Sequence, residues 1–134
     1  GPIAIALASE LPEAHIDAID VNELALDLTR QNAERAGVGD RVHAMTPDAV
    51  DPEARYDEIW SNPPIRIGKP ALDELLATWL PRLAPGGEAR LVVGKHLGAD
   101  SLQRRLADSL GDGFAVERAS TSGGFRILRI ERLR

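Results

Sequence analysis

Short apolar runs alternate with helical patterns along most of the chain, and this alternation restricts the fold more than any other feature. The strand-like runs are residues 15–20, 41–45, 56–61 and 88–94. The helical patterns are residues 2–11, 22–37, 71–83 and 100–111, and Pro81 must kink or end the third of them. Repeated β-α units fold into a mostly parallel sheet with helices packed against it. We therefore predict an α/β fold with a mostly parallel sheet.

The C-terminal end has a different character. Two alternating runs, residues 114–120 and 125–133, flank the glycine-containing sequence "TSGG". Such a pair predicts an antiparallel hairpin. Since the 134 residues contain no repeat and no linker, we predict a single domain over residues 1–134.

The clearest helical segment is residues 22–37. Asn22 is suited to cap its N-terminus, and Gly37 to end it. We expect Leu24, Leu28 and Ala36 to help form the apolar stripe through which this helix packs. We also expect Trp60 and Trp79 to lie in the core rather than to serve as stacking platforms.

Composition excludes several classes of site and protein. The chain has no cysteine, which rules out disulfides, thiolate zinc sites and cysteine nucleophiles. We find no apolar run long enough for a membrane span and no signal peptide, so we expect a cytoplasmic protein. From Gly1 to Ser61 four arginines oppose thirteen acidic residues, whereas from Asn62 to Arg134 twelve basic residues oppose eight. The acidic total of −5 argues against nonspecific nucleic-acid binding, and the basic second half leaves RNA possible.

Polar residues at the carboxyl ends of the strands are the first candidates for a site, because ligands bind there in open α/β sheets. Asp20 ends one strand, where a carboxylate can accept hydrogen bonds from both hydroxyls of a ribose. It can equally be a solvated acid before a helix, and its position also fits a nicotinamide cofactor. Asp48 follows the next strand and can accept from an adenine amino group, or simply form a turn after Pro47.

The sequence "IWSNPPI" is harder to explain as an ordinary surface loop. Pro63 and Pro64 cannot donate to a sheet, so they must end the strand before them. They would also fix the backbone so that carbonyl oxygens and the Asn62 side-chain oxygen point into a cleft. These acceptors can hold an exocyclic amine or amide nitrogen in the geometry in which its lone pair attacks. We therefore predict that this turn positions a nitrogen nucleophile.

The segments "GPIAIALA", "IDVN", "PDAV", "IWSNPPI" and "LAPGGEARLVV", with the hairpin, occur in an order that resembles Rossmann-like S-adenosylmethionine-dependent methyltransferases. The Asn-Pro-Pro turn resembles the branch that methylates amino or amide nitrogens. Together with "VVGKHLGADSL", it is most similar to small-domain ribosomal RNA guanine-N2 methyltransferases. The cofactor residues implied by this resemblance are Gly1, Asp20, Val21, Asp48 and Asn62. The implied catalytic residues are Asn62, Pro63 and Pro64.

The resemblance implies direct in-line methyl transfer to guanine N2 of a ribosomal RNA base that is flipped out of its stack. A rival within enzymes is methylation of a glutamine amide in a protein, which uses the same turn. A rival from another class is a noncatalytic module that binds RNA or protein. A nicotinamide dehydrogenase would share Asp20 but would leave the Asn-Pro-Pro turn unexplained.

Four further residues are candidates for substrate contact. Ile65 stands where the family usually has Phe or Tyr to stack on the base, so it can cover a base only by dispersion. Arg66 and Lys69 can meet RNA phosphates or be ordinary surface charges. His96 follows residues 88–94 at the functional edge of the sheet.

The start of the chain departs from the family pattern. Gly1 aligns with the last glycine of a Gly-x-Gly-x-Gly turn that contacts the methionine part of the cofactor, and the strand before that turn is missing. We therefore expect an N-terminally truncated methyltransferase domain. We also expect hydrogen-bonding groups to be exposed on the missing strand's two neighbours, and an N-terminal segment or partner chain to complete the sheet.

Overall fold

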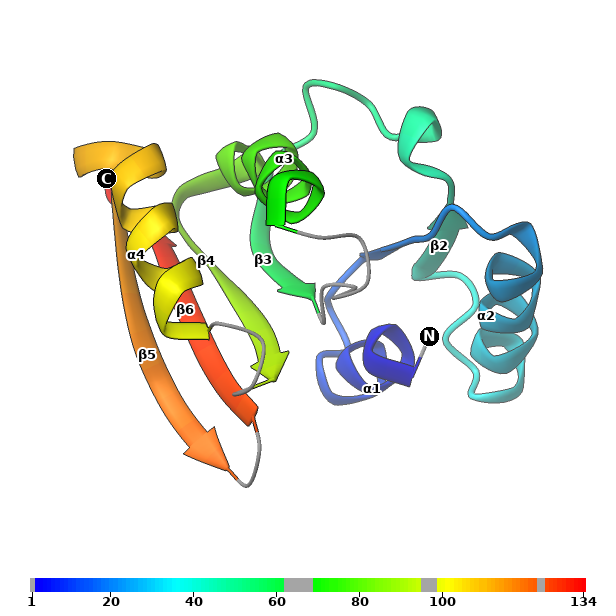
Figure 1. Ribbon diagram of the computed structural model, residues 1–134. Coiled ribbons are helices and arrows are strands. Elements are labelled where there is room, and N and C mark those ends of the chain that lie inside the picture. The colour runs from blue at the N-terminus through cyan, green and yellow to red at the C-terminus, as the bar shows by residue number, and fades with distance from the viewer. Residues whose placement is uncertain (1, 62–68, 95–98, 123–124) are drawn as a thin grey trace. The chain divides into compact units, whose positions relative to one another are not determined.

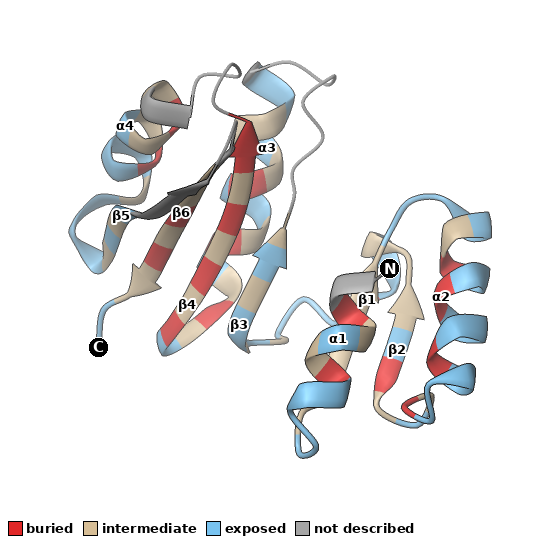
Figure 2. Cartoon of the chain, turned by 90° about the horizontal axis from the view of Figure 1, so that it is seen from below, coloured by how far each residue is buried: buried red, intermediate tan, exposed pale blue. Residues whose placement is uncertain are grey.

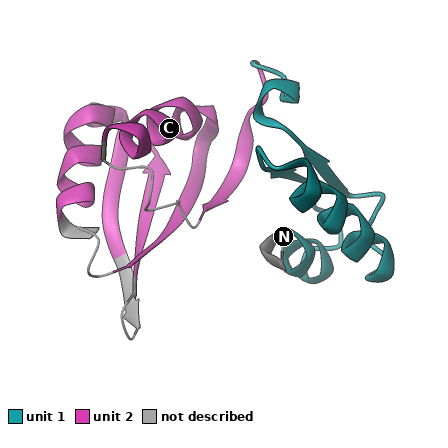
Figure 3. Ribbon diagram, turned by 45° about the vertical axis from the view of Figure 1, so that its right-hand side comes forward, with its two compact units in different colours: residues 1–52 teal, residues 53–134 magenta. Residues whose placement is uncertain are grey.

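The computed structural model describes residues 2–61, 69–94, 99–122 and 125–134. The chain forms two compact units, residues 1–52 and residues 53–134, coloured teal and magenta in Figure 3. Each unit has its own sheet and its own apolar core. The two units are therefore described separately.

Unit 1, residues 1–52, alternates helices and strands as predicted (Figure 1). Its elements are α1 (Pro2–Glu10), β1 (Ile16–Ile19), α2 (Glu23–Arg35), β2 (Val42–Met45) and the short 3₁₀ helix η1 (Pro47–Ala49). The two strands pair in parallel, from Ile16 opposite Val42 to Ile19 opposite Met45. This pairing confirms the predicted β-α-β arrangement.

The core of unit 1 is built largely from small side chains, and Figure 2 colours its buried positions red. Its buried members are Ala4, Ala8, Ala33, Val38 and Val42, and Ile5, Ile16 and Ala18 pack against them. Alanines in α1 and α2 let both helices approach the strands closely. Because side chains alternate along a strand, Asp17 and His43 point away from this core.

Helix α2 is capped as predicted, but a different side of it is buried. The Oδ1 atom of Asn22 accepts hydrogen bonds from the amides of Leu24 and Ala25, at 2.9 and 3.3 Å. The prediction for Leu24 and Leu28 was wrong, since these side chains are 68% and 50% exposed. The buried residues of α2 are Leu26, Thr29 and Ala33. These three follow the i, i+3, i+7 spacing of a helix face roughly opposite Leu24 and Leu28.

Arg41 joins the end of α1 to the start of β2. Its Nη2 atom donates to the carbonyl oxygen of Ala8 at 2.8 Å. Its Nη1 atom donates to the carbonyl oxygens of Leu11 and Ala14, at 3.0 and 3.1 Å. Helix α1 has no basic residue in its own last turn, so Arg41 supplies the positive charge that favours a helix C-terminus.

Unit 2, residues 53–134, contains a four-stranded sheet with the strand order β3-β4-β6-β5. Its elements are β3 (Tyr56–Ser61), α3 (Lys69–Trp79), η3 (Leu80–Arg82), β4 (Leu83–Gly94), α4 (Ala99–Leu110), η5 (Gly111–Gly113), β5 (Phe114–Ser122) and β6 (Phe125–Arg132). β4 runs parallel to β3 and antiparallel to β6. β5 and β6 form the predicted antiparallel hairpin.

The core of unit 2 lies on the face of the sheet that carries α3 and α4 (Figure 2). Its buried residues are Leu76, Leu80, Leu83, Ala89, Leu91, Val93, Leu102, Leu106, Leu128 and Ile130. Helix α3 ends at Trp79, before Pro81, as predicted. Strand β4 starts at Leu83, five residues earlier than predicted, because residues 84–87 bulge between two stretches of pairing with β3.

The opposite face of the unit 2 sheet is polar, and Trp60 lies on it. The prediction of a core position for Trp60 was wrong, since it is 39% exposed. Its Nε1 atom donates to Glu58 Oε2 at 3.0 Å, and the Arg90 guanidinium lies 5.2 Å from its ring centroid. Ile59 packs against the core, so alternation along β3 turns Trp60 to the other face.

Among the described residues, β1 pairs only with β2 and β3 pairs only with β4. Each of these strands therefore has one edge without a strand partner among the described residues. The described helices include none that has both the length and the apolar character needed to cross a membrane.

Candidate functional site

Asp20 lies immediately after β1, at the start of the turn that leads into α2. Its Oδ1 atom accepts a hydrogen bond from the amide of Asn22 at 2.9 Å. Its own amide donates to the carbonyl oxygen of Met45 at 3.2 Å, which links it to the end of β2. Asp20 is exposed, and within the described residues its Oδ2 atom makes no hydrogen bond. The carboxylate is thus held by one oxygen and presents the other to solvent.

Val21 follows Asp20 and is 81% exposed. An apolar side chain so exposed next to a carboxylate offers a surface that an aromatic ring can cover. Asn22 is engaged as the helix cap through its Oδ1 atom. The three consecutive residues therefore present a carboxylate and an apolar side chain on a capped turn.

Asp48 lies in η1, just after β2, and is exposed. Hydrogen bonds to its carboxylate, first from the Thr46 side chain and second from its own backbone amide, lower the pKa of Asp48 below its usual range. The group is therefore a charged acceptor at neutral pH. Such an acceptor suits an amino group of a ligand.

Asp20 and Asp48 follow the same ends of two neighbouring parallel strands. Ile19 and Met45, the last residues of β1 and β2, are directly opposite each other. Both carboxylates that the sequence singled out thus follow the carboxyl edge of the unit 1 sheet. This edge is the candidate site.

The other predicted site residues lie outside the described residues. They are Gly1, Asn62, Pro63, Pro64, Ile65, Arg66 and His96. Lys69 is the first residue of α3, and its side chain is likewise not described. In unit 2, β3 ends at Ser61, directly before Asn62, and the parallel strand β4 ends at Gly94. The predicted Asn-Pro-Pro turn therefore follows the carboxyl end of a parallel strand.

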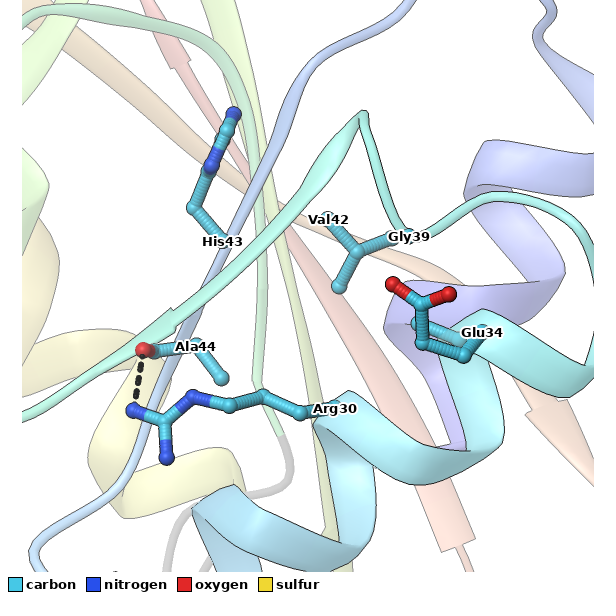
Figure 4. Close-up of a pocket in the computed structure, with 7 residues that line it drawn as sticks. Arg30, Glu34, Gly39, Val42, His43 and Ala44 are labelled. Carbon is cyan, nitrogen blue, oxygen red and sulfur yellow. Dashed lines mark hydrogen bonds between the residues drawn. The ribbon is translucent and has the colours of Figure 1, made fainter.

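A hollow of about 330 Å³ lies between α2 and β2, away from Asp20 and Asp48. It is lined by Arg30, Ala33, Glu34, Gly39, Val42, His43 and Ala44 (Figure 4). Arg30 crosses it to donate from Nη2 to the carbonyl oxygen of Ala44 at 2.9 Å. This contact satisfies a carbonyl of β2 and helps protect the strand from further pairing.

Sequence reasoning did not single out His15 or His43, whose rings stack with 6.2 Å between centroids. The register of β1 and β2 brings them together, and that register is not visible in the sequence. The described part of the chain holds no group of three or more His, Cys, Asp or Glu side chains placed to bind a metal ion.

Comparison with known proteins identifies a family over nearly the whole chain. The family described as "Methyltransferase small domain" matches residues 1–129. The uncharacterized protein YbxB of Bacillus subtilis is 31% identical over 99% of this chain and 66% of its own length. The release factor glutamine methyltransferase of Rhodopirellula baltica is 36% identical over 78% of this chain and 37% of its own length. The chain thus spans about a third to two thirds of these relatives.

A solved structure of similar fold is the ribosomal protein L11 methylase from Lactobacillus delbrueckii subsp. bulgaricus. It superposes with a TM-score of 0.78 and 20% identity, over all of this chain and 65% of that one. At this identity the likeness concerns the fold, which is a Rossmann-like α/β methyltransferase fold with mostly parallel strands and an antiparallel hairpin. Taken with the match over residues 1–129, the chain belongs to the methyltransferase small domain family.

Proposed function

We propose that this chain is the catalytic domain of an S-adenosylmethionine-dependent methyltransferase that acts on a planar nitrogen. The observation that carries the proposal is the pair of exposed carboxylates, Asp20 and Asp48, at one edge of the parallel strands β1 and β2. Membership of the methyltransferase small domain family supports it.

The residues at this edge suit the adenosine part of the cofactor. Asp20 would accept hydrogen bonds from the ribose hydroxyls, while its contact with the Asn22 amide keeps the carboxylate in place. Val21 would cover one face of the adenine ring, and Asp48 would accept from the adenine amino group. The cofactor supplies a methyl group bonded to a positively charged sulfur, which an incoming nitrogen can displace in line.

The Asn-Pro-Pro turn would hold that nitrogen. Its proposed role rests on the sequence: Asn62 and the carbonyl oxygen of Pro63 accept from the hydrogens of the amine, while Pro64 stiffens the turn. Gly1 would approach the methionine part of the cofactor. Ile65, Arg66, Lys69 and His96 would line the approach of the substrate. Positioning then replaces the need for a strong general base.

Two substrates agree with this arrangement. The first is guanine N2 in ribosomal RNA, supported by the resemblance of the Asn-Pro-Pro and "VVGKHLGADSL" segments. The second is a glutamine amide in a protein, favoured by a relative named as a release factor glutamine methyltransferase. Ile65 supports neither strongly, since both families usually carry an aromatic residue at that position.

Cofactor binding is tested first, by calorimetric titration of the chain with S-adenosylhomocysteine. We expect binding that is lost in Asp20→Asn, because the amide oxygen is a weaker acceptor and brings an NH₂ group toward the ribose hydroxyls. Asp40→Asn is the matched control, as another exposed acidic residue of unit 1, and should bind like the wild type. Equal binding by Asp20→Asn, or binding of a nicotinamide cofactor instead, would refute the proposed site.

The substrate is tested by methyl transfer from labelled S-adenosylmethionine, with deproteinised ribosomal RNA and purified release factor offered separately. Label on guanine N2 would support the first candidate, and label on a glutamine side chain would support the second. Binding of the cofactor without transfer to either would favour the noncatalytic alternative.

A further inference from the structure

Two large apolar side chains lie exposed on the outer side of α2. Leu24 is 68% exposed and Leu28 is 50% exposed. They are four residues apart and therefore neighbours on the helix surface. The helix packs into its core through Leu26, Thr29 and Ala33, so neither leucine is needed for that packing. We call Leu24 and Leu28 the α2 patch.

The surroundings of the α2 patch are acidic. Glu23 and Asp27 form the adjacent row of the helix, and Asp20 lies before its N-terminus. Arg30 is engaged by Asp27 at 2.8 Å and by the carbonyl oxygen of Ala44. Arg35, in the last turn of α2, is the other cation of the helix. Unit 1 as a whole has ten Asp or Glu residues against three arginines, a net charge of −7.

We propose that the α2 patch is a docking surface for a protein segment that presents apolar side chains flanked by lysine or arginine. One face of a basic amphipathic helix has this chemistry. Leu24 and Leu28 would be covered by its apolar residues. Glu23 would face its cations, and Asp27 would share its carboxylate between Arg30 and the partner. The charge around the patch decides between classes of partner, because the same negative potential repels the phosphates of RNA.

The patch is distinct from the proposed cofactor contacts. Val21, assigned to the adenine ring, is not part of it, and neither leucine follows a strand end. The docking proposal therefore does not depend on which substrate is methylated. A partner bound there would lie on the same helix that Asn22 caps beside Asp20.

The test measures fluorescence anisotropy of a labelled helical peptide made of leucine and lysine. The patch variant is Leu24→Ala with Leu28→Ala, which keeps a good helix former at both positions. The control is Leu133→Ala, which removes a side chain that is 44% exposed in unit 2. Far-ultraviolet circular dichroism checks that all variants are folded.

We expect saturable binding of the leucine-lysine peptide by the wild type and by Leu133→Ala. The patch variant should bind at least about tenfold more weakly, since two leucines lose their contact with the peptide. A Glu23→Gln, Asp27→Asn variant should also bind more weakly and with less dependence on salt.

Three results would overturn the proposal. The first is unchanged affinity in the patch variant, which would mean that the peptide is held by charge alone. The second is tighter binding of a single-stranded RNA that competes with the peptide. The third is concentration-dependent self-association of the wild type that the patch variant abolishes, which would make a second copy of the chain the occupant.

Discussion

Replacing Arg41 should destabilise unit 1 by more than an ordinary surface substitution. Arg41→Met keeps much of the aliphatic length and removes three donated hydrogen bonds, to the carbonyl oxygens of Ala8, Leu11 and Ala14. Hydrogen bonds to charged groups contribute about 1.5–3 kcal/mol each. One of these three is exposed, and bonds from a single guanidinium are not additive. We therefore expect the free energy of the local opening that exposes the amides of α1 to solvent to fall by about 2–4 kcal/mol.

The assay is amide hydrogen exchange followed by NMR, read at the helical amides of α1, for wild type, Arg41→Met and Arg41→Lys. Lysine keeps the charge but cannot reach three carbonyls from a planar group, so it should fall between the other two. Arg104→Met, at an exposed position on α4, is the control and should change little. A change at α1 below about 0.5 kcal/mol in Arg41→Met would refute the reasoning, because it would show that water replaces the arginine without cost.

Three further predictions concern single contacts. Asn22→Ala should lower the free energy of unfolding by about 1 kcal/mol in urea titrations, whereas Asn22→Asp, which can still cap α2, should not. Thr46→Val should raise the lowered pKa of Asp48 toward its ordinary value of 3.8, as followed by carboxyl NMR shifts. Because the pKa of Asp48 is depressed in the folded state, its stabilising contact is complete above pH 3.8. The contact is lost as the pH falls through the folded-state pKa. Leu91→Ala, at a fully buried position of β4, should cost about 2–5 kcal/mol in the same urea titrations, and an unchanged midpoint would contradict the assigned core.

The order of elements could be predicted from the sequence because local patterns determine it. Short apolar runs between helical patterns indicated the strands. Asn22 and Gly37 indicated the ends of α2, through cap and turn chemistry that involves only near neighbours. The carboxylates Asp20 and Asp48 were singled out for a similar reason. Asp20 directly follows β1 and Asp48 comes three residues after β2, and strand ends are visible in the sequence.

Features that depend on long-range packing could not be predicted. The apolar residues of α2 lie on two sides, and only the position of the strands decides that Leu26 is buried and Leu24 is not. Trp60 is a large, mostly apolar residue of the kind found in cores. Side chains alternate between the two faces along β3, and because Ile59 packs against the core, Trp60 lies on the polar face. Arg41 gave no signal at all, since its partners precede it by about thirty residues.

The parallel pairing of β1 and β2 has a consequence for how such a domain can evolve. Because Ile19 and Met45 are opposite each other, the separation of Asp20 from Asp48 is set by the spacing of adjacent strands, about 4.8 Å, and by the short segment from Met45 to Asp48. The intervening helix and its loops do not enter that distance. Substitutions on the exposed side of α2 would therefore change the outside of unit 1 while leaving the two carboxylates in place.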